Sequence, residues 1–362
     1  MEFGLFSNGF RPHTTAAQTY EEDLAEIVLA DQLGFRDVYI SEHHGEPIYI
    51  NKVDTLPVPE LLMCKAAAVT KQIRMGAAVK LIHLAHPVDT AINAAVADHV
   101  IGNGRYIFGF GSGFPSPQFA NERGLTYEDR HERLREALDL ILKCWTAKEP
   151  FDWDGKHFKG KGIVATPQPL HPPHMPMATA TDTPAMMDIA ATRGYTQLMA
   201  QLEGPSSIRR KGDHYVRAAK AAGHKVPLKN ITVARYVYLA DSRKEAMDDL
   251  RADINYELGY QMKRGLIRLV KSNYDIGIKG DEVTFDQLAE AGIYYLGDPD
   301  TVAKQLREFY EEAGGFGTLL IVAGKKWATR EKVHRSMRLF MEHVAPKLRD
   351  LVPMRDPDAA AA

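Results

Sequence analysis

The chain has 362 residues, of which 45% are hydrophobic and 25% charged, and its formal net charge is −2. This composition is typical of a globular protein with a large core, and it offers no basic surface for nucleic acid or an anionic membrane. The only two cysteines, Cys64 and Cys144, exclude a disulfide framework and favour a cytoplasmic location. We see no signal peptide and no apolar run of the length that a membrane helix needs.

Short apolar runs alternate with helical patterns along most of the chain. The expected strands are residues 3–6, 37–41, 73–82, 105–110, 177–181, 196–200, 231–239 and 318–322. The first helix is expected to be capped by Thr19 and to stop at Gly34. Eight strand–helix units predict a closed (β/α)8 TIM barrel, with an open doubly wound sheet as the alternative.

Two segments interrupt this rhythm. Residues 148–176 are rich in proline and contain Phe151, Trp153 and Phe158, which suggests a small hairpin outside the barrel. Residues 259–296 do not form a simple barrel unit. We therefore expect one domain over residues 1–350 with these two insertions, followed by a flexible tail at residues 351–362.

Polar side chains cluster at the carboxyl ends of the expected strands. They are Asn8, Glu42, His43, His44, His83, His86, Ser112 and residues 181–183. In a parallel barrel these ends meet at one mouth, where catalytic groups lie. Histidine titrates near neutral pH, which suits proton transfer. The alternative is that Glu42, His43 and His44 only cap a strand and bond one another.

Two local motifs could contact a ligand. Gly109, Gly111 and Gly113 allow close backbone approach to a flat ligand or a phosphate, although a tight barrel turn without ligand explains them equally well. They do not match the dinucleotide fingerprint. The run from Thr181 to Pro184 precedes a helix, so it predicts either an anion site or an ordinary cap by Thr183.

Other chemistries fit the sequence poorly. His83 and His86 have a spacing that a metal could use, but no carboxylate pair lies nearby, and we expect no metal. The chain has no G-x-S-x-G motif, and Ser112 is offset from the position it would need, which disfavours a serine hydrolase.

Taken in order, the motifs resemble those of the bacterial luciferase-like flavin monooxygenases. The resemblance spans nearly the whole chain. It is carried by Ser-Glu-His-His at 41–44, Ala-His-Pro at 85–87, the glycine-rich run at 104–113, and residues 130–138, 149–158, 297–302 and 340–346.

The resemblance implies a TIM barrel with reduced FMN in its mouth and a mobile lid at 259–296. A separate flavin reductase would supply the FMN in a transient encounter. Oxygen would add to the flavin as a C4a-peroxide that oxidises a small organic substrate. The resemblance makes His43 the catalytic base, His44 a neighbour of flavin or substrate, and Glu42 an orienting partner.

The resemblance also implies where the flavin lies. Its ring would rest near Ala78 and Val79, where the family often has a strained peptide bond, and its phosphate near Asp182 and Thr183. Gly111 and Ser112 stand where the luciferase α subunit carries Cys and Arg. Because that Arg helps to hold the phosphate, the phosphate grip must be weaker here or built elsewhere.

Two other functions stay open. One is an F420-dependent oxidoreductase of the same fold that transfers hydride, and the other is a non-catalytic flavin-binding protein. The intact Glu42-His43-His44 sequence favours the monooxygenase over both. Hydroxylation, Baeyer–Villiger insertion and aldehyde oxidation are not separated by the sequence. We expect a homodimer formed through the early helices.

Overall fold

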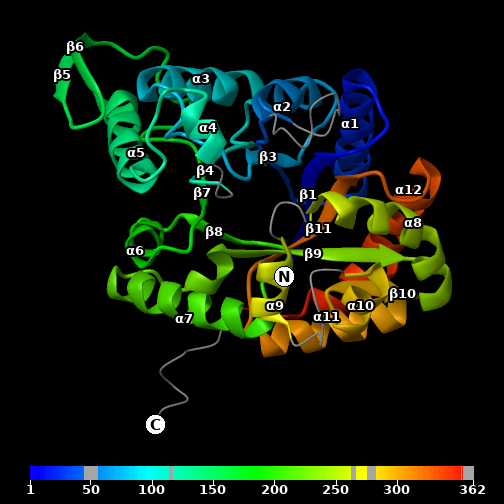
Figure 1. Ribbon diagram of the computed structural model, residues 1–362. Helices are drawn as coiled ribbons and strands as arrows, with labels where there is room; N and C mark the ends of the chain where they lie inside the picture. The colour runs from blue at the N-terminus through cyan, green and yellow to red at the C-terminus, as the bar shows by residue number, and fades with distance from the viewer. Residues whose placement is uncertain (45–55, 114–116, 262–265, 275–282, 352, 354–362) are drawn as a thin grey trace.

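The computed structural model describes residues 1–44, 56–113, 117–261, 266–274, 283–351 and 353, and a ring of eight parallel strands forms its centre (Figure 1). The strands are, in ring order, β1 (Glu2–Phe10), β2 (Asp37–Ile40), β3 (Arg74–Ala77), β4 (Tyr106–Gly111), β7 (Met177–Ala180), β8 (Thr196–Met199), β9 (Ile231–Leu239) and β11 (Thr318–Lys325). The pairing of β8 with β9 closes the ring. The predicted TIM barrel is confirmed, and the open sheet is excluded.

Helices surround the ring and connect its strands. They are α1 (Ala16–Leu33), α2 (Pro59–Ala67), α3 (Pro87–Ile101), α4 (Pro117–Asn121), α5 (Arg130–Thr146), α6 (Pro184–Thr192), α7 (Pro205–Ala221), α8 (Arg243–Gln261), α9 (Leu266–Asn273), α10 (Phe285–Glu290), α11 (Pro299–Glu312), α12 (Arg330–Leu339) and α13 (Ala345–Leu348). Within the described ranges, no helix has the length and apolar composition that crossing a membrane requires.

The core has two layers because side chains along a strand point alternately to opposite faces. On β9, Val233 and Val237 belong to the outer cluster between sheet and helices. Ala234 and Tyr236 belong to a second cluster that also contains Val79 inside the barrel and extends to α8 and α10. The near-continuous apolar character of the strands follows from this burial on both faces.

The first insertion is a hairpin, as predicted. It pairs β5 (Phe151–Asp154) with β6 (Lys159–Ile163) in antiparallel fashion and projects beyond α5 (Figure 1). Glu136 of α5 anchors it, because its carboxylate accepts hydrogen bonds from the backbone N–H groups of His157 (2.9 Å) and Phe158 (3.0 Å).

The start of α1 differs from the prediction. Thr15, and not Thr19, is the N-cap: its hydroxyl accepts the Gln18 N–H (3.2 Å), and the Gln18 side chain accepts the Thr15 N–H (3.0 Å). This reciprocal capping box leaves Thr19 inside the helix, where it is buried. Gly34 ends the helix as expected.

The second irregular segment contains a strand that the periodicity did not reveal, β10 (Tyr294–Gly297). Residues 232–235 of β9 pair with β11, whereas residues 236–239 pair with β10. With β8, β9 therefore has three neighbour strands along its length. The proposed lid at 259–296 comprises the end of α8, α9, α10 and β10, while residues 262–265 and 275–282 lie outside the described residues.

The predicted third strand is also shorter than expected. Its regular ladder ends at Ala77, after which Lys80 alone pairs again, with Phe110. At this place β3 and β4 approach so closely that a Cβ on Gly109 would lie 1.7 Å from the Ala77 carbonyl oxygen. A Cβ on Gly111 would lie 2.8 Å from Val79 Cγ2. Strand packing alone thus accounts for these two glycines.

We expect Gly109→Ala to lower the free energy of unfolding by about 2 kcal/mol or more, because the new methyl group would meet rigid backbone. Gly212→Ala in α7 is the matched control, since a Cβ there has no heavy atom within 4 Å and alanine is favoured in helices by about 1 kcal/mol. Chemical denaturation measures both. Equal stability of the two variants would contradict the close-approach argument.

Candidate active site

The carboxyl ends of β1 and β2 are joined by hydrogen bonds at the mouth of the barrel. The Ser41 N–H donates to the Ser7 carbonyl (2.9 Å), and the Ser41 hydroxyl donates to the Asn8 carbonyl (3.1 Å). The backbone that precedes Glu42 is therefore fixed by its neighbour strand. This brings the predicted residues Asn8 and Glu42 to the same edge of the ring.

Glu42 is the centre of a group of charged side chains. Its Oε1 lies 2.8 Å from His44 Nε2, and its Oε2 lies 3.4 Å from Lys80 Nζ. Lys80 Nζ also lies 3.0 Å from Glu60 Oε1 of α2. Burial lowers the pKa of Lys80. The carboxylates of Glu60 and Glu42 raise it by more, so the pKa of Lys80 is above its ordinary value. The ammonium therefore stays charged between two carboxylates.

The two histidines of the motif have different surroundings. His44 Nδ1 lies 3.3 Å from Arg123 Nη2, and the His44 ring meets Phe119 edge-on at 5.6 Å. The backbone N–H of His43 donates to the Leu56 carbonyl (3.3 Å). The structure thus brings Glu42 and His44 into direct contact, as the bonded-cap alternative also expected.

Ala78 and Val79 lie beside this group, at the end of β3. The peptide bond between them is cis. The Ala78 N–H donates to the Ile40 carbonyl (2.8 Å), and the Gly111 N–H donates to the Lys80 carbonyl (3.1 Å). The predicted residues Ala78, Val79 and Gly111 therefore lie on adjoining strand ends next to Glu42.

Ser112 and His83 share a small cavity behind this group. The cavity is lined by Leu81, His83, Leu84, Ser112, Phe119, Ala120 and Tyr127. His83 is 6% exposed, and burial, with the nearby Arg133 guanidinium, lowers its pKa to about 4. Its imidazole is therefore neutral at neutral pH.

His86 has a structural role instead. Its Nδ1 accepts the Val88 N–H (3.3 Å) at the start of α3, and its ring meets Phe158 at 5.9 Å. No group of three or more His, Cys, Asp or Glu side chains in the described part of the chain could hold a metal ion.

The predicted anion site lies where β7 leads into α6. The Thr183 N–H donates to Thr181 Oγ1 (3.2 Å), and the two hydroxyl oxygens are 3.1 Å apart. Thr183 is the N-cap residue of α6 but makes no side-chain cap bond. Thr183 thus occupies the cap position that the sequence indicated, although its side chain does not bond the helix backbone. Asp182 is mostly exposed, with 82% of its side-chain surface accessible.

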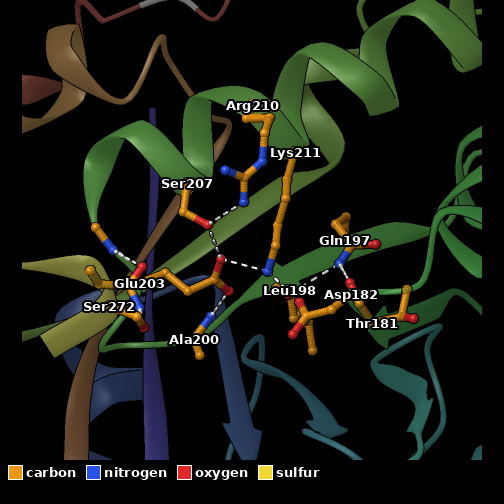
Figure 2. A network of polar contacts seen from close by, with 12 residues as sticks. Thr181, Asp182, Gln197, Leu198, Ala200, Glu203, Ser207, Arg210, Lys211 and Ser272 are labelled. Carbon is orange, nitrogen blue, oxygen red and sulfur yellow. Dashed lines mark hydrogen bonds and ion pairs between the residues drawn. The ribbon is translucent and has the colours of Figure 1, made fainter. Parts of the chain in front are cut away.

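Lys211 is a residue of this region that the sequence did not indicate. It extends from α7, and its Nζ bonds Asp182 and lies 2.7 Å from Glu203 Oε2 (Figure 2). Burial lowers the pKa of Lys211, but Glu203 and Asp182 raise it to a net value above the ordinary one. Lys211 is far along the chain from Thr181, so no local motif could have revealed the contact.

Aromatic side chains form the opposite wall of the barrel. Tyr236 of β9 stacks on Tyr294 of β10 with ring centres 4.6 Å apart, and Trp327 lies 5.7 Å from Tyr236. In the ring order β9 is four strands from β3 in either direction, so Tyr236 lies on the strand across the barrel from β3. Val79 and the three aromatic side chains belong to the same buried apolar cluster.

The sequence matches known proteins along most of its length. The model of the luciferase-like monooxygenases matches residues 1–316. The 3,6-diketocamphane 1,6-monooxygenase of Pseudomonas putida is 27% identical, over 98% of this chain and 100% of that protein. The oxygenase component of a flavin-dependent trigonelline monooxygenase from Acinetobacter baylyi is 28% identical, over 68% of this chain and 67% of that protein.

Solved structures of known proteins also resemble this chain. The oxygenating constituent of 3,6-diketocamphane monooxygenase from Pseudomonas putida, a type II Baeyer–Villiger monooxygenase in complex with FMN, superposes with a TM-score of 0.82. It is 26% identical and covers 96% of this chain and 98% of its own. An F420-dependent secondary alcohol dehydrogenase shares the fold, with a TM-score of 0.70 over 98% of this chain and 99% of its own, at 16% identity.

The burial of His83 predicts that the free energy of unfolding of the protein depends on pH. Its pKa of about 4 in the folded protein is below the unfolded value of about 6.5, so the stability it contributes is complete above pH 6.5 and is lost as the pH falls toward 4. We expect the difference in unfolding free energy between the wild type and His83→Gln to shrink by up to about 3 kcal/mol over this window. Denaturation at several pH values measures it, and a constant difference would contradict the burial of His83.

Proposed function

This chain belongs to the luciferase-like monooxygenase family, and we propose that it is the oxygenase component of a two-component flavin monooxygenase. It takes reduced FMN, O2 and a small organic substrate, and a separate flavin reductase delivers the FMN. The observation that carries the proposal is the Glu42, His44 and Lys80 group beside the Ala78–Val79 peptide, across the barrel from an aromatic wall.

The comparisons favour FMN over F420. The relative whose structure contains FMN is 26% identical to this chain, whereas the F420-dependent neighbour, at 16%, supports the fold alone. The oxygenase component from Acinetobacter baylyi supports a partnership with a separate reductase.

The residues at the strand ends fit a flavin phosphate. Thr181 and Thr183 present hydroxyl groups at the first turn of α6, which has no side-chain cap. The amino end of a helix attracts anions. Lys211 supplies a cation near this turn, in place of the arginine that Ser112 replaces. We infer that Ala78, Val79 and Gly111 hold the flavin ring and that Asp182 positions Lys211.

We assign separate roles in the reaction to the side chains of this site. Reduced FMN supplies the electrons that activate O2. His43 is the proposed base, since an imidazole exchanges protons near neutral pH. Glu42 orients His44 through the 2.8 Å contact. Tyr236, Tyr294 and Trp327 provide apolar surface that excludes water and suits a small apolar substrate.

We also propose a homodimer through α2 and α3, which lie next to each other (Figure 1). Leu61 of α2 is 72% exposed, and Val96 and Val100 of α3 are exposed as well. Apolar side chains gathered on neighbouring helices are typical of a subunit interface. Light scattering that gives the mass of one chain would contradict this proposal.

The function is tested with photoreduced FMN. The protein and reduced FMN are mixed anaerobically, oxygen is admitted, and the absorbance of oxidised flavin is followed. We expect slower reoxidation than for free FMN, because the site excludes water and shields the flavin. Unchanged reoxidation, together with tight binding of F420, would favour the alternative function.

His43→Ala is then compared with the wild type for product formed per FMN oxidised, on a panel of small ketones and alkenes. We expect product formation to fall about 100-fold, which is typical for loss of a general base. His214→Ala serves as the control, because His214 lies on α7 and pairs with Asp188. If both variants behave like the wild type, His43 is not the base.

Lys211→Met tests the phosphate grip. We expect FMN to bind about tenfold more weakly, as is typical for loss of one charge-assisted contact. Binding of riboflavin, which has no phosphate, should be unchanged. Lys220→Met on the same helix is the control, and both affinities are measured by fluorescence titration. An equal loss for FMN and riboflavin would show that Lys211 acts only on the structure.

A further inference from the structure

His44 is held at both ring nitrogens by charged side chains. Its Nε2 lies 2.8 Å from Glu42 Oε1, and its Nδ1 lies 3.3 Å from Arg123 Nη2. A carboxylate oxygen accepts hydrogen bonds, whereas a guanidinium group only donates them. Both contacts are satisfied together only when the imidazole hydrogen is on Nε2 and the Nδ1 lone pair faces Arg123.

We propose that Arg123 is a positioning residue that locks His44 in its neutral Nε2–H tautomer. The consequence for catalysis, that Glu42 orients His44 and that His44 is not the base, rests on the proposed function. The tautomer itself follows from the contacts and does not depend on a flavin.

Arg123 is well placed for this role because α4 and its last turn hold it from the other side. Its Nη1 donates to the Phe119 carbonyl (3.0 Å) and lies 3.6 Å from Glu122. Phe119 also packs its ring edge-on to His44. The same short helix therefore fixes both the guanidinium and one side of the imidazole.

The opposite side of the lock is equally constrained. Glu42 is held by Lys80 at 3.4 Å and by the Leu81 N–H at 3.5 Å, and Lys80 is held in turn by Glu60. The carboxylate cannot turn away from His44 without losing these contacts. In the described part of the chain, Glu42 and Arg123 are the charged groups in contact with the imidazole, and Lys80, Glu60 and Glu122 lie behind them.

The other neutral tautomer would lose both contacts. An Nδ1–H imidazole places a donor against the donors of Arg123, and its Nε2 lone pair would face the Glu42 carboxylate. The contacts therefore select the Nε2–H tautomer. Because the Nδ1 lone pair faces Arg123, His44 has a role distinct from that proposed for His43.

The test uses the full-length protein with 15N-labelled histidine. Long-range 1H–15N correlation separates the protonated and unprotonated ring nitrogens, and His44→Gln identifies the signals of His44. We expect one protonated Nε2 and one unprotonated Nδ1 at mildly alkaline pH. An Nδ1–H tautomer, or a rapidly exchanging mixture, would overturn the proposal.

Arg123→Met should release the lock, so that part of the His44 population takes the Nδ1–H tautomer at the same pH. Arg123→Lys keeps a donor and should restore much of the wild-type pattern. Arg338→Met, in α12, is the matched control. If Arg123→Met leaves the His44 signals unchanged, or if Arg123→Lys resembles the methionine variant, the assignment to Arg123 is wrong.

The outcome is separable from the proposed function. The tautomer is measured without flavin or substrate, so a lock that is present in a protein with no effect on FMN reoxidation would overturn the function and leave the lock standing. Conversely, slow reoxidation with no tautomer preference would retain the function and reject the lock.

Discussion

The arrangement of the mouth depends on the burial of one carboxylate. Glu42 is 9% exposed, and a buried charge is costly unless it is paired and hydrogen-bonded. It obtains its partners from two directions, His44 on its own strand end and Lys80 on the next. Each partner needs a further one, which Arg123 and Glu60 supply. A single buried acid therefore connects α2, two strand ends and the residues after α4.

Three histidines at the same end of the barrel differ in role because their surroundings differ. His44 is held between charges, His83 is buried and neutral, and His86 caps a helix. From the sequence they were equivalent candidates, because each follows an expected strand. Only the neighbours contributed by α4, α5 and the hairpin distinguish them, and those neighbours are distant in sequence.

The periodic features of this fold could be predicted, since burial on two faces and strand–helix alternation are local properties. Features that depend on distant contacts could not. β10 has only four residues, and apolar and polar residues do not alternate along it. Thr15 is the N-cap of α1 because it forms reciprocal hydrogen bonds with Gln18. Lys211 of α7 and Arg123, just after α4, reach the site from segments whose local pattern only indicates a solvated surface. The glycines of β4 were noticed, but their cause, the approach of β3, is visible only in three dimensions.

The exchange of partners along β9 ties the second insertion to the barrel. Beyond Arg235, β9 pairs with β10 in place of β11. β10 follows α10 at the end of that insertion. The backbone ladder that holds it therefore starts on a strand of the ring. A displacement of β10 would disturb the strand that carries Tyr236, which mechanically couples the insertion to the inside of the barrel.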